Sequence, residues 1–202
     1  EDFARVMANF YNGRHRGPDN SHFVTLDRLM LGFHRLSING LEKGNQPFHM
    51  KGVYLVCNGE IYNHKELMRG MNLESETGSD CEVIVHMYKA FGIEHTLRSL
   101  RSSEFAFVLW DEEQRTLYAA RDPYGVRPLY HLVQGNQVYI ASELKMANEL
   151  AQCAKVHVPG TYTRYGFSHA HGRFTYIDTT TYATFPAIQP SMSVENARSL
   201  IR

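Results

Sequence analysis

Apolar side chains recur at helical spacing at the start of the chain and again near its middle. In the first stretch they are Phe3, Val6, Met7 and Phe10. This spacing predicts an amphipathic helix over residues 2–12, which ends near the first glycine. In the second stretch they are Ile84, Met87, Tyr88 and Phe91. They form one apolar stripe of a helix that runs from residue 80 to about 91.

Short apolar runs between these helices predict β-strands. They cover residues 22–26, 30–36, 53–57, 105–110, 116–120 and 137–141. Lys51-Gly52 and Gly135-Asn136 are turn sequences, and with the short spacing of the runs they favour antiparallel hairpins over parallel crossover units. Because the strands outnumber the helices and are mostly sequence neighbours, the sequence predicts an α+β fold with layered antiparallel sheet.

Two further stretches, residues 64–70 and 142–150, predict short helices. The helix that begins at residue 80 has a marked start, because Ser79 and Glu82 have the spacing of a capping box. We therefore expect the hydroxyl of Ser79 and the carboxylate of Glu82 to close the first turn of that helix.

After Tyr176 the sequence pattern changes from strand-like apolar runs to threonines and prolines. Residues 179–181 together with Pro186 and Pro190 predict an extended linker, and residues 193–202 predict the start of another helix. The sequence thus predicts one domain over residues 1–177, followed by a linker and the beginning of a second domain over residues 178–202.

Composition narrows the class of protein without identifying it. The 202 residues are 43% hydrophobic and 12% aromatic, which is typical of a globular protein. Lys+Arg and Asp+Glu are both 21, so no basic bias indicates a nucleic-acid or membrane-surface partner. No apolar run approaches the ~20 residues that span a bilayer. Three cysteines without a CxxC spacing favour a reducing, cytoplasmic compartment over a disulfide framework.

Four short polar motifs interrupt the apolar pattern. They are His15-Arg16-Gly17-Pro18-Asp19, Arg35-Leu36-Ser37-Ile38, Asn58-Gly59-Glu60-Ile61-Tyr62-Asn63 and Gly78-Ser79-Asp80-Cys81-Glu82. A guanidinium can bind a carboxylate with two hydrogen bonds, and a carboxylate can bind an ammonium group. An amide beside a glycine N–H can direct two donors at one oxyanion. Together these groups are suited to hold an amino acid and to stabilise an oxyanion beside it.

Each of these groups also has a structural interpretation. Asn58-Gly59 follows a buried run, and Asn-Gly is the strongest two-residue signal for a hairpin turn. Arg35 at a strand end is compatible with a solvated edge residue. Asp80 fits the first turn of a helix, where the helix dipole favours an acid, and Glu60 fits a loop charge.

Two motifs are interpreted as architecture. Gly17 and Pro18 make the first motif a rigid loop, in which Arg16 and Asp19 would connect loops near a pocket. Residues 121–128, Arg-Asp-Pro-Tyr-Gly-Val-Arg-Pro, are interpreted as a turn with paired charges that joins two strands.

The sequence does not indicate a metal site or a nucleotide-binding site. His169 and His171 lie in a loop flanked by glycine, and two histidines without a third ligand favour a polar hairpin tip over a metal site. The chain contains neither a P-loop nor a GxGxxG motif. We therefore expect no metal and no cofactor in this domain.

The four motifs in this order resemble the glutaminase domain of class II, or N-terminal-nucleophile, glutamine amidotransferases. Pro18 after His-Arg-Gly and residues 58–63 are similar to asparagine synthetases of the glutamine-hydrolysing type, whereas relatives in purine and hexosamine synthesis generally carry another residue in place of Pro18. The resemblance extends from about Phe3 to Tyr176, and residues 121–130 reinforce it. It implies a four-layer α/β/β/α sandwich of antiparallel sheets.

The resemblance also implies a reaction, in which an N-terminal cysteine attacks the side-chain amide of glutamine and uses its own α-amine as the base. The residues implied in glutamine binding are Arg35, Leu36, Ser37, Ile38, Asn39, Asn58, Gly59, Glu60 and Asp80. Arg35 would bind the α-carboxylate, with the backbone of the next four residues beside it. Asn58 and Gly59 would form the oxyanion hole, while Glu60 and Asp80 would hold the α-amino group.

The resemblance further implies partners for the domain. The ammonia released from glutamine would pass to a C-terminal ATP-dependent domain, which binds ATP and Mg²⁺ and activates aspartate as its adenylate. The resemblance implies a cytoplasmic ligase, and we expect it to be a homodimer.

The nucleophile of the family follows the initiator methionine, whereas this sequence starts at Glu1. Cys57, Cys81 and Cys153 cannot present a free α-amine. The sequence therefore predicts a fragment that is truncated at both ends, lacks its first strand and does not hydrolyse glutamine by itself. Two alternatives stay open: a catalytically inactive binding or regulatory module, and the amidotransferase half of an enzyme with another ammonia acceptor.

Overall fold

The computed structural model describes residues 2–135 and 137–184 of the chain. Its helical elements are α1 (Asp2–Tyr11), η1 (Arg14–Arg16), α2 (His64–Gly70), η2 (Asp80–Glu82), α3 (Val83–Ser99), η3 (Leu144–Met146) and η4 (Asn148–Cys153), where η denotes a 3₁₀ segment. Its strands are β1 (Asn20–Leu26), β2 (Leu29–Arg35), β3 (Phe48–Met50), β4 (Val53–Glu60), β5 (Glu104–Asp111), β6 (Thr116–Arg121), β7 (Tyr130–Gln134), β8 (Gln137–Ala141), β9 (Lys155–Val156), β10 (Thr161–Ser168) and β11 (Arg173–Thr181).

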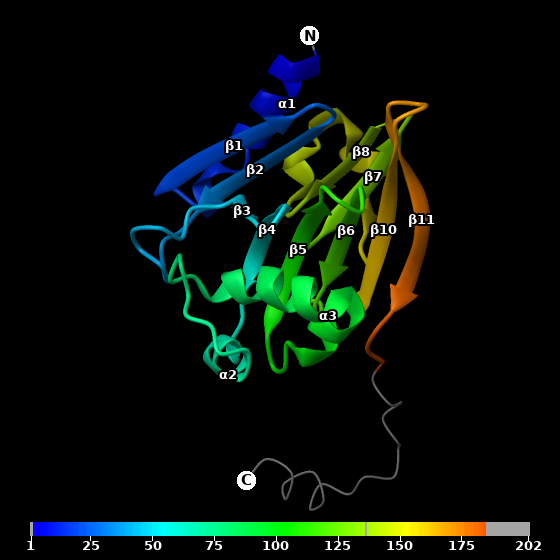
Figure 1. Ribbon diagram of the computed structural model, residues 1–202. Helices are drawn as coiled ribbons and strands as arrows, with labels where there is room; N and C mark the ends of the chain where they lie inside the picture. Colours follow the sequence, from blue (N-terminus) through cyan, green and yellow to red (C-terminus); the bar gives the residue numbers. More distant parts are fainter. Residues whose placement is uncertain (1, 136, 185–202) are drawn as a thin grey trace, which may run out of the picture.

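Within these residues the strands form three antiparallel sheets (Figure 1). The largest has the order β11-β10-β6-β5-β4-β3, and the smaller ones have the orders β1-β2 and β8-β7-β9. The pairing is antiparallel throughout, which confirms the expectation from the short connections and turn sequences.

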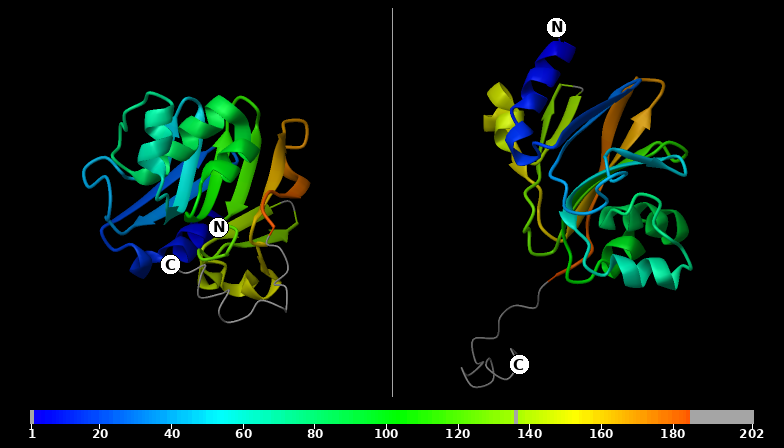
Figure 2. Two further views of the ribbon diagram at one scale, coloured as in Figure 1. Left: turned by 90° about the horizontal axis from the view of Figure 1, so that it is seen from below. Right: turned by 90° about the vertical axis from the view of Figure 1, so that its left-hand side faces the viewer.

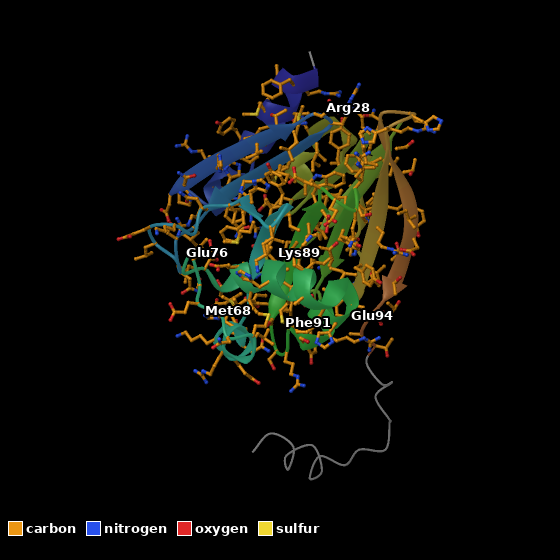
Figure 3. All side chains as sticks on the ribbon, in the orientation of Figure 1. Arg28, Met68, Glu76, Lys89, Phe91 and Glu94 are labelled. Carbon is orange, nitrogen blue, oxygen red and sulfur yellow. The ribbon has the colours of Figure 1, made fainter. Side chains whose placement is uncertain are left out.

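The sheets stack face to face with helices outside them (Figure 2). Helices α2 and α3 cover one face of the large sheet. The two smaller sheets lie against its other face, and α1 and the η3–η4 segment lie outside them. Figure 3 shows Met68 on α2 and Lys89, Phe91 and Glu94 on α3, on the side of the large sheet away from α1. The fold is therefore the four-layer α/β/β/α sandwich that the resemblance implies.

Strand β4 shows how the sequence builds both interior layers. Val53, Leu55 and Cys57 point to one face and join the core between the large sheet and α3. Val56 points to the other face and packs in the core between the sheets. Because successive side chains of a strand point to opposite faces, an apolar run of this kind is buried on both sides. Asn58 follows Val56 on the inter-sheet face, so the strand directs a polar side chain into the middle of the sandwich.

Several predicted elements are confirmed with small differences in their bounds. The helix predicted over residues 2–12 is α1, and the predictions over 64–70 and 137–141 coincide with α2 and β8. Lys51-Gly52 forms the turn between β3 and β4, with both residues at positive φ. Strands β3, β7, β9, β10 and β11 were not predicted, because they are short or carry polar residues on both faces.

The predicted helix after residue 80 differs in its start and in its length. The sequence continues as α3 beyond Phe91 to Ser99, with a break at Gly92, whose φ is 78°. The capping box is wrong: Ser79 makes no side-chain capping hydrogen bond, and the Glu82 carboxylate instead binds the loop before it. The helix predicted over 142–150 is replaced by the two 3₁₀ segments η3 and η4.

The predicted linker also starts too early. Residues 178–181 continue β11, where Thr179 pairs with Thr163 and Asp178 forms an ion pair with Arg164. Tyr182 is buried and its hydroxyl donates to the Arg121 carbonyl oxygen at 2.7 Å. Pro186, Pro190 and the helix expected over residues 193–202 lie outside the described residues, and so does Asn136 in the turn between β7 and β8.

Candidate functional site

A cavity of about 270 Å³ lies between the large sheet and the two smaller ones. Its walls come from β2 and the loop after it, the ends of β4 and β5, the start of η2, and β8. The predicted site residues that line it are Arg35, Leu36, Ile38, Asn39, Asn58, Gly59 and Asp80. Residues from three separate motifs are therefore brought to one cavity, although they are far apart in the sequence.

Two of the predicted residues do not line this cavity. The backbone N–H of Ser37 donates to Asp19 Oδ2 at 2.7 Å, which joins the loop after β2 to the first motif. Glu60 ends β4 directly opposite Glu104 of β5. Like charges opposite each other on neighbouring strands repel. The structure balances this pair with Arg127, which forms an ion pair with Glu104.

Arg35 is buried, so its interpretation as a solvated edge residue is wrong. Its guanidinium donates to the carbonyl oxygens of Asn39 at 3.0 Å, of Leu41 at 3.3 Å and of Gly40. It also donates to Asn45 Oδ1 at 2.8 Å. All these acceptors are neutral, and among the described residues no carboxylate lies within ion-pair distance of Arg35. A buried cation with only neutral partners favours an anionic ligand beside it.

Asn58 lies inside β4 opposite Ala106, so the hairpin-turn interpretation of Asn58-Gly59 is wrong. Its Nδ2 atom is buried and has no hydrogen-bond partner among the described residues. Buried donors are almost always paired, so an unpaired amide in a cavity wall is suited to a ligand oxygen. Gly59 is required by the sheet itself, because a Cβ atom there would lie 2.3 Å from the Glu104 carbonyl oxygen.

Asp80 is buried at the start of η2, where it is both the first acidic residue of a helical turn and a wall of the cavity. Its Oδ2 accepts the backbone N–H of Ile61 at 2.6 Å, and its Oδ1 accepts Asn39 Nδ2 at 3.4 Å. The two interpretations of Asp80 therefore hold together. The carboxylate connects the segment after β4 with the loop after β2, at the cavity wall.

Glu82 is fully buried two residues beyond Asp80. Burial alone would raise the pKa of this carboxyl group. Hydrogen bonds from the hydroxyls of Ser75 and Thr77 and from the backbone N–H groups of Glu76 and Thr77 outweigh burial and hold its pKa at about 2. Glu82 therefore stays ionised at neutral pH and fixes the loop that leads into Asp80.

The first motif acts as the architecture that was expected. Gly17 packs so closely on β2 that a Cβ atom would lie 2.2 Å from the backbone of His34. Arg16 donates to Glu143 at 2.9 Å and so connects η1 with the segment after β8. Hydrogen bonds from Arg16 and from Lys145 outweigh burial and hold the pKa of Glu143 below its usual value.

The segment 121–128 joins β6 to β7, as expected, but Arg121 and Asp122 bind backbone groups rather than each other. The Arg121 guanidinium donates to three carbonyl oxygens, among them that of His157 at 2.8 Å. Asp122 is fully buried and accepts four backbone N–H groups, among them that of Phe105 at 3.3 Å. These bonds fix the loop that carries Arg127 to the cavity wall.

Two cavity residues were missed by the sequence analysis as site residues. Gln46 is buried, and its side-chain amide bonds both the N–H and the carbonyl of Cys57, at 2.6 and 3.2 Å. It thereby fixes β4 just before Asn58, and no sequence signal indicates this contact. Arg127 lies within a motif that the sequence did mark, although only as a turn.

The Cys81 thiol is not activated as a nucleophile. Cys57 and Cys81 are buried, and a hydrogen bond to Cys57, followed by burial, raises the pKa of the Cys81 thiol well above its ordinary value. His169 and His171 lie at the tip of the β10–β11 hairpin, as expected. Across residues 2–135 and 137–184, no group of three or more potential ligands could hold a metal ion. No described helix has the length and apolar composition needed to cross a membrane.

A second cavity of about 540 Å³ continues between the smaller sheets, and β2 and β8 border both cavities. In the part of the chain that the structure describes, β2 pairs with β1 alone and β8 pairs with β7 alone. Two strand edges thus border the candidate site without a partner strand. Their backbone groups could hydrogen-bond to an additional strand.

The four layers of this fold recur in solved amidotransferase structures. In the solved structures, glutamine phosphoribosylpyrophosphate amidotransferase from B. subtilis matches 77% of this chain and 35% of its own, with a TM-score of 0.59 and 21% identity. A second structure, described as the allosteric regulatory enzyme of purine biosynthesis, has a TM-score of 0.60 and 22% identity over 77% of this chain and 35% of its own. At identities of 21% and 22%, the similarity to these two structures shows that the chain shares their fold.

The family follows from the sequence comparison. The profile of the glutamine amidotransferase domain matches residues 2–159, so the chain belongs to this family. This confirms the resemblance that the four motifs indicated.

Curated relatives agree with this assignment. Asparagine synthetase [glutamine-hydrolyzing] 1 of Bacillus subtilis is 39% identical over 136 residues, which is 65% of this chain and 21% of the relative. Asparagine synthetase B of Escherichia coli is 40% identical over 154 residues, which is 74% of this chain and 27% of the relative. Amidase chry2 of Gibberella zeae is 42% identical over 138 residues, which is 65% of this chain and 20% of the relative. The chain thus matches about a fifth to a quarter of the length of these relatives.

Proposed function

We propose that this chain is the glutamine-hydrolysing domain of an asparagine synthetase. The observation that carries the proposal is the meeting of Arg35, Asn58 and Asp80 at one cavity. Among residues 2–135 and 137–184, Arg35 has only neutral acceptors there and Asn58 Nδ2 has none. The relatives named as asparagine synthetases support the choice of enzyme.

In this proposal glutamine lies across the cavity. Its α-carboxylate binds Arg35 and takes the place of loop carbonyl oxygens, because a charged acceptor forms stronger hydrogen bonds with a guanidinium than neutral ones do. Its α-ammonium group binds Asp80, with Glu60 adding negative charge nearby. The oxygen of the side-chain amide points to Asn58 Nδ2 and to the N–H of Gly59.

The nucleophile in this proposal is a cysteine at the natural N-terminus, on a strand that pairs with the edges of β2 and β8. Its thiol passes a proton to the α-amine, and the sulfur attacks the amide carbon. The donors at Asn58 and Gly59 stabilise the oxyanion. The C–N bond then breaks, ammonia leaves with the proton, and water hydrolyses the thioester to glutamate and free thiol. The chain of 202 residues should bind glutamine without hydrolysing it.

The proposal extends to the rest of the enzyme. Ammonia passes to a C-terminal domain that uses ATP and Mg²⁺ to amidate aspartate, in a cytoplasmic homodimer. The relatives named as amidases keep another acceptor open, because the glutaminase pocket binds glutamine and not the acceptor.

Isothermal titration of the chain with glutamine tests the pocket. Binding without release of glutamate or ammonia is the expected result, and absence of binding by the folded chain would refute the proposal. The full-length protein with its natural N-terminus should release glutamate from glutamine and, with ATP and aspartate, form asparagine.

A second candidate is a module that binds glutamine without chemistry. It is favoured by one observation: Cys57 and Cys81 are buried, and the raised pKa of Cys81 keeps its thiol protonated. The two candidates differ in the first residue of the mature protein. A cysteine there supports the enzyme, whereas another residue together with glutamine binding supports the module.

A further inference from the structure

The carboxylate of Glu82 lies at the centre of a buried network that the proposed chemistry does not use. Ser75 Oγ and Thr77 Oγ1 each donate to Oε2 at 2.6 Å, and the backbone N–H of Thr77 donates to the same oxygen at 2.8 Å. The backbone N–H of Glu76 donates to Oε1 at 2.8 Å, and His86 Nε2 lies 3.1 Å from that oxygen. One side chain therefore fixes three consecutive residues of the preceding loop.

A second contact holds this network from the other side. Lys51 Nζ, at the turn between β3 and β4, lies 3.1 Å from Nδ1 of His86. An ammonium group can only donate, so Nδ1 of His86 accepts the hydrogen bond from Lys51. Nε2 of His86 therefore carries a hydrogen and donates it in a hydrogen bond to Glu82 Oε1. His86 thus reaches the carboxylate from within α3, while residues 75–77 reach it from the loop. Glu82 is held in one position by both.

The loop fixed by Glu82 touches the loop that surrounds Arg35. Gly40 packs against it so closely that a Cβ atom would lie 2.7 Å from the Thr77 carbonyl oxygen and 2.9 Å from the Ser79 nitrogen. Gly40 is also a partner of Arg35, because its carbonyl oxygen accepts from the guanidinium. A continuous series of contacts therefore connects Glu82, through residues 75–79, with the loop around Arg35.

We propose that Glu82 is a positioning residue for glutamine recognition, which orders residues 75–79 and through them sets both Asp80 and the loop 36–45 around Arg35. The inference rests on the proposed function and adds a residue to it that contacts no substrate. Asp80 lies at the end of the ordered loop and Arg35 lies beyond the Gly40 contact. We expect recognition of the α-ammonium group to depend on Glu82 most directly.

The test compares the affinity of the 202-residue chain for glutamine and for glutaramate, which is glutamine without its α-amino group. Because a charge-assisted hydrogen bond to Asp80 is present with glutamine alone, the wild-type chain should prefer glutamine by ~10–100-fold. In Glu82→Gln an amide NH₂ group faces donors of the loop, and the preference should fall by ~10-fold. A general loss of stability would weaken the binding of both ligands alike. It would leave the ratio of the affinities for glutamine and glutaramate unchanged.

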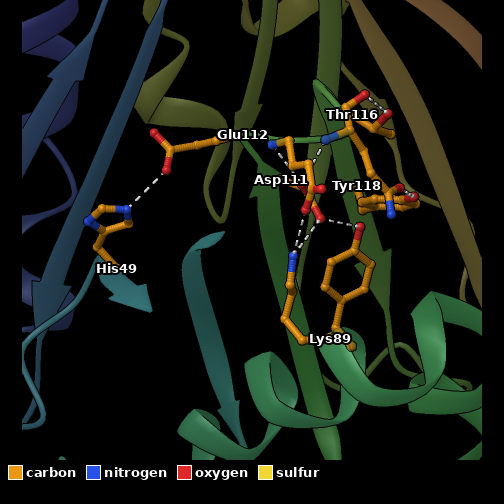
Figure 4. Close-up of polar contacts among 9 residues, drawn as sticks. His49, Lys89, Asp111, Glu112, Thr116 and Tyr118 are labelled. Atoms are coloured by element: carbon orange, nitrogen blue, oxygen red, sulfur yellow. Dashed lines mark hydrogen bonds and ion pairs between the residues drawn. The ribbon is translucent and has the colours of Figure 1, made fainter. Parts of the chain in front are cut away.

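Two further variants keep the test decisive. Ser75→Ala removes one donor to Glu82 and should give a smaller fall in the same ratio. Tyr88→Phe is the matched control, since it removes a buried hydrogen bond from α3, the helix that follows Glu82, made to Asp111 at 3.0 Å. Figure 4 shows that Asp111 also binds Lys89. This control should leave the ratio at its wild-type value.

Hydrogen–deuterium exchange gives a readout that does not need glutamine. The amides of residues 36–45 and 75–79 should exchange faster in Glu82→Gln and Ser75→Ala, and at the wild-type rate in Tyr88→Phe. If the wild-type chain binds no glutamine, the proposed function is refuted and the exchange rates still decide whether Glu82 orders the two loops. Unchanged exchange in residues 36–45, or an unchanged ratio in a chain that does bind glutamine, would overturn the inference.

Discussion

Replacing Glu82 by glutamine is expected to lower the stability of the fold at neutral pH by about 3 kcal/mol. The buried carboxyl group has a pKa of about 2 in the fold, compared with an ordinary value of 4.5, because the hydrogen bonds from Ser75, Glu76 and Thr77 outweigh burial. This difference of about 2.5 units, at about 1.36 kcal/mol per unit, corresponds to roughly 3 kcal/mol. The variant keeps the shape of the side chain and removes its charge.

The sign of the pH dependence follows from the lowered pKa. Above pH 4.5 the carboxylate is ionised in both states and its stabilisation is fully present. As the pH falls toward 2, the unfolded chain takes up the proton first and the stabilisation is lost. At pH 3.5 about 1 kcal/mol of it is lost, so the difference between wild type and Glu82→Gln should shrink to about 2 kcal/mol.

Urea unfolding at pH 7 and pH 3.5 measures this difference, with the fluorescence of the single tryptophan, Trp110 in β5, as the signal. Thr163→Val serves as the control, because it removes a hydrogen bond between two hydroxyls, made to Thr179 at 2.8 Å, and neither group titrates between these pH values. A difference between wild type and Glu82→Gln that is the same at both pH values would refute the reasoning.

Four further changes test the site and its surroundings. In the full-length enzyme, Asn58→Ala should reduce glutamine-dependent turnover by ~10²–10³-fold and spare synthesis from added ammonia, as measured by asparagine formation from each nitrogen source. Arg35→Lys should mainly raise KM for glutamine, because lysine lacks the bidentate geometry, and steady-state kinetics would show an equal loss in kcat if Arg35 were merely structural. Gly59→Ala should destabilise the fold by ~1–3 kcal/mol in urea unfolding, since its Cβ atom would lie 2.3 Å from the Glu104 carbonyl oxygen. His157 is buried, and burial lowers its pKa to about 4 from 6.5. The unfolded state therefore gains protons first below pH 6.5, and wild type should lose up to ~3 kcal/mol between pH 6.5 and 4 that His157→Gln retains; parallel stability curves for the two proteins would contradict this.

Much of the secondary structure could be predicted because it depends on local spacing. The stripe over α1 and the apolar run of β4 each show a period that fits one element, and both elements form where they were expected. The class α+β and the family also follow from the sequence, since the four motifs keep their order and residue types. Residue type further indicated that Arg35, Asn58 and Asp80 belong to one site.

Local rules failed where a contact from elsewhere in the chain prevailed. Asn58-Gly59 has the sequence of a turn, yet β5 pairs with both residues and keeps them in β4. Ser79 and Glu82 have the spacing of a capping box, yet three residues of the preceding loop supply better donors to the carboxylate. In both cases the partner outside the motif offers more hydrogen bonds than the motif itself, and the spacing of the motif does not reveal that partner.

The sequence by itself determined the elements with a clear period, such as α1 and β4, the family of the protein and the residue types of its candidate site. The tertiary structure alone decided how these residues are set: that Arg35 is buried with neutral acceptors, that Asn58 Nδ2 has no partner in the described part of the chain, and that Glu82 binds the loop before it. Periodicity is a property of neighbouring residues and can be read locally. Burial and hydrogen bonding depend on segments that meet when the sheets stack, because one side chain can gain its partners there from several motifs at once.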